Sequence, residues 1–170
     1  MAGTTVAVAG IVATVLLLAC SAFFSSSETA IFSLPRAWID ERAASDDRAR
    51  VLQELVDDPH RLLVTLLVGN NVVNVAISSI VTVLVTSYLD PGPAVVVATA
   101  VTSVLVLLFG EIVPKSVGLG NAEQWSVTVA PVVKGVEVLL GPVITVFDVV
   151  TRRIGTVFDG DEAIEEPYVD

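Results

Sequence analysis

The chain has 170 residues, of which 54% are hydrophobic and 16% charged, whereas soluble domains carry roughly 25% charged residues. Its net charge is −10, from nineteen acids and nine bases, which leaves no basic surface for nucleic-acid binding. The single cysteine, Cys20, lies in an apolar run and can form neither a disulfide framework nor a thiolate metal site. This composition predicts an integral membrane protein.

Three uncharged stretches approach the roughly 20 apolar residues that a helix needs to cross a bilayer. They cover residues 6–24, 62–89 and 94–110. No Lys or Arg precedes the first stretch. It therefore lacks the basic segment of a signal peptide and is expected to stay in the protein as a membrane helix. Asp90-Pro91-Gly92-Pro93 forms a turn between the second and third stretches, which predicts that these two helices are antiparallel.

With three crossings, every basic residue falls on one side of the membrane. The nine are Arg36, Arg42, Arg48, Arg50, Arg61, Lys115, Lys134, Arg152 and Arg153. The positive-inside rule then places the N-terminus outside and the C-terminus in the cytoplasm. We expect a multi-pass protein of the plasma membrane.

The cytoplasmic segments contain three further predicted features. Residues 25–40 are expected to dip into the membrane and return, because their apolar part stops at Pro35. Ser45-Asp46-Asp47 provides a helix start, and Val51, Leu52, Leu55 and Val56 give the following helix an apolar face toward the membrane surface. Asp58-Pro59 is typical of the start of the second crossing.

Residues 125–147 allow two readings. They could cross the membrane a fourth time, but Lys134 and Glu137 interrupt the apolar run and Pro131 and Pro142 break the helical ladder. We therefore favour a kinked belt helix along the cytoplasmic interface. Residues 1–155 would form the membrane domain, and residues 156–170 an acidic cytoplasmic tail.

Polar side chains occur on all three predicted crossings. Ser21 and Ser25 are spaced i, i+4 on the first, and Asn70, Asn74 and Ser78 form a stripe on the second. Serines alone usually bond to their own helix, and asparagines often bond between helices. Glu111 follows seventeen uncharged residues, and an acid at that depth indicates function.

The residues around Glu111 add a backbone oxygen to this set. Pro114 has no amide to pair with the carbonyl of Gly110, so that oxygen is expected to be free. The alternative is that Pro114 merely ends the helix and Glu111 lies at the interface. Hydroxyl, carboxamide, carbonyl and carboxylate oxygens together suit a hard cation such as Mg²⁺ rather than zinc or copper.

Three stretches, LACSAFFSSSETAIFSL at residues 18–34, LLVGNNVVN at 66–74 and GEIVPK at 110–115, resemble the transmembrane module of the cyclin M/CorC magnesium transporter family. The resemblance implies an all-α homodimer with three transmembrane helices, a re-entrant helical connection and a cytoplasmic belt helix. It also implies a Mg²⁺ site formed by Ser21, Ser25, Asn70, Asn74, Gly110 and Glu111. Asn71 faces elsewhere by helical geometry.

The resemblance further implies Mg²⁺ transport in the direction of export, with Na⁺ as the candidate coupling ion. Family members usually continue into a paired CBS domain that senses MgATP, and no such pattern precedes Asp170, so ATP regulation is expected only with that domain. The alternative is a Mg²⁺-binding membrane sensor or scaffold that modulates other transporters. No enzyme activity is expected, because a serine at membrane depth without a histidine or lysine partner has no general base.

Overall fold

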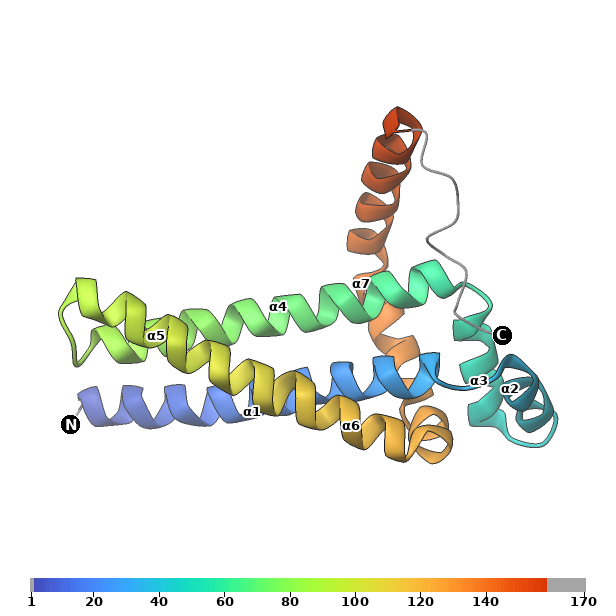
Figure 1. Ribbon diagram of the computed structural model, residues 1–170, viewed down its shortest axis with the longest axis horizontal. Coiled ribbons are helices and arrows are strands. Elements are labelled where there is room, and N and C mark those ends of the chain that lie inside the picture. Colours follow the sequence, from blue (N-terminus) through green and yellow to red (C-terminus); the bar gives the residue numbers. More distant parts are fainter. Residues whose placement is uncertain (1, 159–170) are drawn as a thin grey trace. The chain divides into compact units, whose positions relative to one another are not determined.

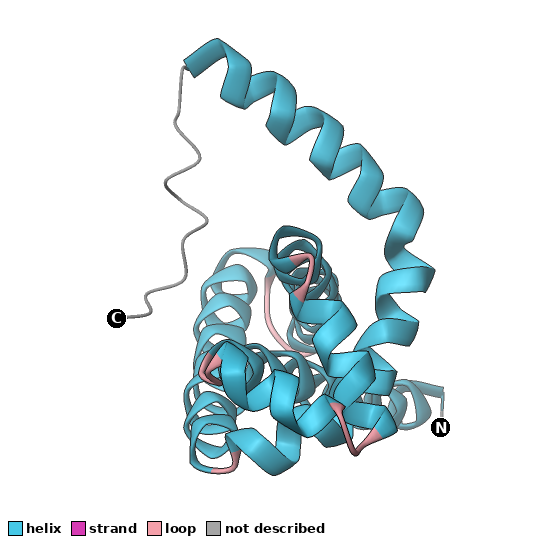
Figure 2. Cartoon of the chain, turned by 90° about the vertical axis from the view of Figure 1, so that its right-hand side faces the viewer, coloured by secondary structure: helices cyan, strands magenta, loops and turns pink. Residues whose placement is uncertain are grey.

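The computed structural model describes the backbone of residues 2–158 and the side chains of residues 4–147. Within that range the chain forms only helices and the turns that join them (Figure 2). The predicted acidic tail lies outside the described residues from residue 159 onward. The helices are α1 (Ala2–Phe32), α2 (Arg36–Ala43), α3 (Asp47–Val56), α4 (Pro59–Thr86), α5 (Pro91–Leu105), the π-helix η1 (Val106–Ile112), α6 (Val113–Gly120) and α7 (Ala122–Phe158).

Four helical stretches are long and apolar enough to cross a membrane. They are Thr4–Phe32, Pro59–Thr86, Pro91–Gly120 and Ala122–Phe147. In the most apolar 18 residues of each stretch, between 11% and 28% are buried inside the protein. Most of their apolar side chains therefore face outward, as lipid contact requires. The prediction of a helical, multi-pass membrane protein is confirmed, whereas the choice between three and four crossings stays a prediction.

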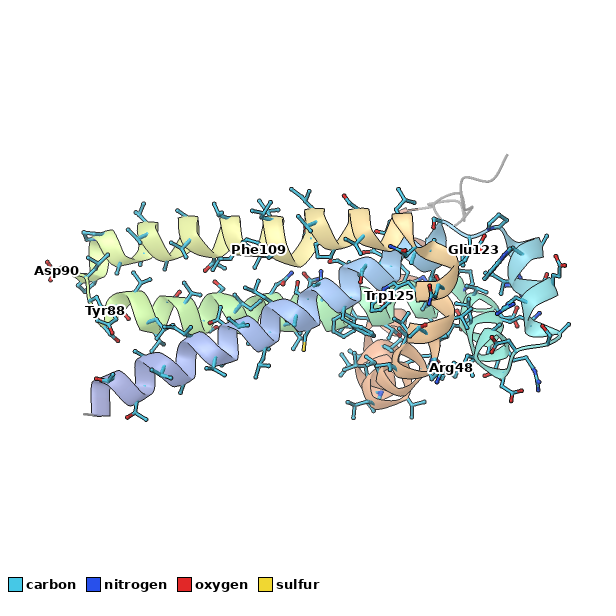
Figure 3. The ribbon with its side chains drawn as sticks, turned by 90° about the horizontal axis from the view of Figure 1, so that it is seen from below. Arg48, Tyr88, Asp90, Phe109, Glu123 and Trp125 are labelled. Atoms are coloured by element: carbon cyan, nitrogen blue, oxygen red, sulfur yellow. The ribbon has the colours of Figure 1, made fainter. Side chains whose placement is uncertain are left out.

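The chain divides into two compact units. Unit 1 contains Met1–Ser26 and Gly69–Gly120, and unit 2 contains Ser27–Val68 and Asn121–Asp170. In unit 1 the first part of α1, the last part of α4 and the continuous α5–η1–α6 helix lie side by side with alternating direction (Figure 1). The start of α1 and the α4–α5 turn, which carries Tyr88 and Asp90, lie at the same end of unit 1 (Figure 3).

The core of unit 1 is narrow. Ile77, Val81 and Ala98 are buried, and Leu17, Leu18, Val73, Val85 and Val106 pack against them. Large apolar side chains on the outer faces of the same helices are exposed, such as Leu16 at 63% and Val96 at 70%. Unit 1 is therefore held together from inside by few residues and is covered outside by side chains suited to lipid.

Helix α1 is longer than the sequence predicts. It continues through Ser25 to Phe32, and the chain leaves the helix only at residues 33–35 before α2 begins at Arg36. The break occurs there because Pro35 disfavours helical geometry in the preceding residue. The predicted connection of residues 25–40 is therefore mostly regular helix, and its dip into the membrane stays a prediction.

The third predicted crossing also extends further than expected. Residues 91–93 belong to α5 instead of the turn, and the helix continues past Gly110 to Gly120. Pro114 therefore does not end the helix but lies buried within it. The π-helix η1 precedes Pro114, and Val113 donates its amide to the carbonyl of Leu108, five residues earlier.

Unit 2 packs the short helices against α7. Asp46 caps α3 by accepting from the amide of Arg48 at 2.9 Å, and Asp58 accepts from the amide of Arg61 at 3.0 Å at the start of α4, as predicted. Leu52 and Leu55 on α3 are buried, and α3 contacts α2 and α7. Leu52 and Leu55 of the predicted apolar face are thus covered by protein, and the position of α3 at the membrane surface stays a prediction.

Arg36 links the two ends of the α2–α3 segment. Its guanidinium pairs with Asp57 and lies 3.4 Å from Asp40, and the hydrogen bond to Asp57 raises the pKa of Arg36. Gln53 donates to Asp40 at 2.8 Å. These exposed contacts orient α2 against α3 and contribute little free energy individually.

Helix α6 approaches the backbone of α1 closely at Gly118. A Cβ atom at this glycine would lie 2.4 Å from the carbonyl oxygen of Ser26, whereas a Cβ at Gly120 would meet nothing within 4 Å. We expect Gly118→Ala to destabilise the protein by roughly 1–3 kcal/mol, because backbone must move to admit the methyl group. Thermal unfolding in detergent measures this loss. Gly120→Ala is the matched control, and an equal effect of the two changes would contradict a close contact at Gly118.

Candidate metal centre

Most hydroxyl side chains in the long helices bond to a carbonyl of their own helix. Thr14, Thr65 and Ser79 each donate to the carbonyl four residues earlier at 2.8 to 2.9 Å. The same bond is made by Thr82, Thr86, Thr99, Ser116, Thr128 and Thr145. Such bonds satisfy a hydroxyl group in hydrocarbon without help from another helix. Ser21 and Ser25 on α1 do not follow this pattern.

The Ser21 hydroxyl lies among three oxygen atoms of other helices. Its Oγ is 2.9 Å from Asn70 Oδ1, 2.8 Å from Asn74 Oδ1 and 3.5 Å from the carbonyl oxygen of Gly110. Ser21 is fully buried. A hydroxyl carries one hydrogen, so it can satisfy only one of these three acceptors at a time. The three oxygen atoms around Ser21 Oγ therefore outnumber the one hydrogen that this hydroxyl can donate to them.

Gly110 brings a backbone oxygen to this cluster from η1. It is the buried residue of the π-helix, and a Cβ atom there would lie 2.7 Å from Ser21 Oγ. In an α-helix its carbonyl would bond to the amide of residue 114, which is Pro114 and has none. The absence of a side chain at Gly110 and of an amide at Pro114 together let Ser21 approach this oxygen.

Ser25 lies one helical turn after Ser21 on α1. Its side chain is fully buried, and its Oγ has no hydrogen-bond partner among the described residues. A buried hydroxyl without a partner is destabilising by about 1–3 kcal/mol. Ser25 therefore has an oxygen available for a ligand that the protein itself does not provide.

Glu111 follows Gly110 directly in η1 and is partly buried. Within the described part of the chain no hydrogen bond or ion pair engages its carboxylate. Uncompensated charge is costly next to an apolar helix. A bound cation would provide the missing positive charge.

The arrangement gathers oxygen atoms of the kinds that hard cations prefer. It offers hydroxyl, carboxamide and carbonyl oxygens with one adjacent carboxylate, and the described part of the chain contains no group of three or more His, Cys, Asp or Glu side chains placed to hold a metal ion. Neutral oxygens with few charges suit Mg²⁺ or another hard ion better than zinc or copper. One negative charge also leaves a divalent ion only half neutralised.

The structure brings four of the six predicted ligand residues together. Hydrogen bonds join Ser21, Asn70 and Asn74, with Gly110 at the longer distance. Ser25 and Glu111 are neighbours of this cluster along their helices, with no bond to it. Asn71 is exposed, in agreement with its exclusion, and Ser78 is exposed as well, so the predicted polar stripe on α4 ends at Asn74.

The π-helix was not predicted from the sequence. Sequence reasoning assumed α-helical geometry up to Gly110, and the structure has seven residues of π-helix from Val106 to Ile112. The sequence offers one signal for it, which is Pro114 four residues after Gly110. The helix nevertheless continues past this proline to Gly120. A local π segment is one way to keep such a helix continuous.

Comparisons with known proteins agree with this architecture. A family model described as the cyclin M transmembrane N-terminal domain matches residues 12–170. A chloroplastic DUF21 domain-containing protein of Arabidopsis thaliana is 36% identical over 153 residues, which cover 90% of this chain and 23% of the relative. The UPF0053 inner membrane protein YfjD of Escherichia coli K12 is 31% identical over 136 residues, covering 79% of this chain and 31% of the relative.

A third relative extends the set to another bacterium. A UPF0053 protein of Haemophilus influenzae is 30% identical over 142 residues, covering 82% of this chain and 33% of the relative. The chain thus spans between 23% and 33% of the length of these three relatives.

Proposed function

The chain belongs to the cyclin M transmembrane domain family, and from this premise we propose that it moves Mg²⁺ across the membrane. The proposed ligands are Ser21, Ser25, Asn70, Asn74, Gly110 and Glu111. The observation that supports this most directly is the excess of oxygen acceptors around the Ser21 hydroxyl. A cation entering there would engage lone pairs that hydrogen bonds leave open.

The composition of the site favours transport over permanent binding. Mg²⁺ prefers oxygen ligands in octahedral geometry and gives up its water reluctantly. Neutral oxygens can replace part of its hydration shell, while the single carboxylate of Glu111 attracts it without neutralising it. Binding is then favourable enough for entry and weak enough for release.

We propose a direction of export and Na⁺ as the coupling ion, both from the family relationship. Regulation by ATP would depend on a paired CBS domain. A Mg²⁺-binding sensor that modulates other transporters is the competing function, and no enzyme activity is proposed. Liposomes containing the purified chain separate these functions, because only a transporter moves Mg²⁺ by itself.

Glu111→Gln removes the proposed charge at constant size. We expect this variant to lose Mg²⁺ flux in liposomes, measured with and without a Na⁺ gradient. We also expect it to lose Mg²⁺-dependent thermal stabilisation, which for the unaltered chain should approach about 2.7 kcal/mol at one hundred times the dissociation constant. An unchanged Mg²⁺ titration in a folded Glu111→Gln protein would refute the site.

The asparagines on α4 offer a matched comparison in the same experiment. Asn70→Ala and Asn74→Ala should weaken both readouts, because both oxygens face Ser21. Asn71→Ala changes the exposed neighbour and should leave both readouts unchanged. If Glu111→Gln abolishes binding while the unaltered chain binds Mg²⁺ without any flux, the sensor function replaces transport.

For topology we propose three crossings, with the N-terminus outside, the C-terminus in the cytoplasm and α7 as a belt along the cytoplasmic interface. Single cysteines at Gly92, Arg48 and Gly160, in a Cys20→Ala background, test this with an impermeant thiol reagent. The cysteine that replaces Gly92 should react from outside, and the cysteines that replace Arg48 and Gly160 should react from the cytoplasm. If the cysteines at positions 160 and 92 react from the same side, α7 is a fourth crossing.

We also propose that the chain is a homodimer in the membrane. Unit 1 buries few residues in its core and exposes apolar side chains that include Val101 and Val104 on α5. A single narrow bundle of this kind encloses little space for an ion path. Mass measurement in detergent should give twice the chain mass, and a purely monomeric mass would contradict the dimer.

A further inference from the structure

A second charged cluster occurs in unit 2, and the proposed transport site does not use it. Glu137 on α7 is 6% exposed. Its Oε1 lies 2.9 Å from Nε of Arg61 on α4 and 3.4 Å from Nζ of Lys134 on α7. One buried carboxylate oxygen therefore faces two cations. The cluster carries a net positive charge in a chain whose net charge is −10.

The side chains of Arg61 and Lys134 have more N–H donors than the hydrogen bonds to Glu137 use. A guanidinium has five N–H donors and an ammonium three, and among the described residues the side-chain bonds of these two cations are Arg61 Nε to Glu137 Oε1 and Lys134 Nζ to the same oxygen. Both side chains are 35% exposed. Within the described residues no second carboxylate pairs with either of them. Asp58 bonds to the backbone amide of Arg61 and not to its guanidinium.

The helix surface next to the cluster leaves room for a ligand. Gly141 follows Glu137 by one turn, and a Cβ atom added there would lie 3.6 Å from Nη2 of Arg61. Because Gly141 has no side chain, no Cβ atom at this position contacts Nη2 of Arg61. Glu137 fixes the two cations near one point without neutralising both.

The two helices that carry this cluster have exposed apolar side chains on their other faces. Val138 and Leu139 on α7 are 69% and 78% exposed, and Leu63 and Leu67 on α4 are 39% and 46% exposed. Both helices are also long and apolar enough to cross a membrane, so an oxyanion bound by the two cations would lie on helices suited to lipid contact. A phospholipid combines a phosphate with acyl chains in this way, whereas a soluble phosphate would leave the apolar surface unused.

We propose that Arg61 and Lys134, held in place by Glu137, bind the phosphate of an anionic phospholipid. Arginine binds phosphate through two parallel N–H groups, and lysine adds a point charge. Glu137 acts as a positioning residue that does not touch the lipid. This proposal does not rest on Mg²⁺ transport, and it is tested by binding alone.

The test compares lipid retention by the purified chain in neutral detergent. Native mass spectrometry should show preferential retention of phosphatidylglycerol over phosphatidylcholine, and the preference should fall as NaCl rises. Lys134→Gln removes the excess charge and keeps the Arg61–Glu137 pair, so it should reduce the preference about fivefold. Lys134→Arg should restore it. Arg48→Gln, which removes an exposed base of the same unit, is the control and should have no effect.

Three outcomes would overturn the proposal. The first is a chain that shows no preference for phosphatidylglycerol, a result that needs no variant. The second is an equal loss in Lys134→Gln and Arg48→Gln, which would indicate general charge attraction. The third is thermal stabilisation by inorganic phosphate together with none by phosphatidylglycerol, which would assign the site to a soluble anion.

Discussion

Hydrocarbon neither donates nor accepts hydrogen bonds, and every polar group of this chain that faces it must find a partner within the protein. The backbone meets this condition by forming long helices, and hydroxyls such as Thr14 and Ser79 meet it by bonding to the preceding turn. Ser21 instead bonds to other helices, and among the described residues the buried hydroxyls of Ser25, Ser27, Thr102 and Ser126 have no partner. Of these, Ser25 is the one that lies one helical turn from Ser21.

The fold was predictable wherever one local rule decides. Uncharged length identified the crossings, and caps such as Asp46 and Asp58 marked helix starts that the structure confirms. The sequence predicts a first crossing that ends at residue 24, whereas α1 continues to Phe32 and the chain leaves the helix just before Pro35. Local sequence also could not show that α7 covers α3, since this depends on contacts between segments far apart in the chain.

The residues that meet in the Ser21 cluster could be listed from the sequence, whereas their geometry could be predicted only in part. Helical spacing correctly separated Asn70 and Asn74 from Asn71. It could not show that both carboxamide oxygens meet the same hydroxyl, because that depends on the distance between α1 and α4. Nor could it reveal a π segment at Gly110, since its hydrogen bonds differ from α-helical ones by a single residue.

The π segment has a consequence for how the third long helix meets α1. Its inward positions recur every fourth residue, as Ala94, Ala98, Val106, Gly110, Pro114 and Gly118. In an α-helix each step of four residues overshoots a full turn by about 40°, so a stripe of this length would wind away from its neighbour. A π turn contains more than four residues, and each such step within it falls short of a full turn. The segment thus resets the rotational phase, so that Gly110 meets Ser21 and Gly118 meets Ser26. A change that relaxed it to an α-helix would turn both glycines away from α1 while leaving every proposed ligand in the sequence.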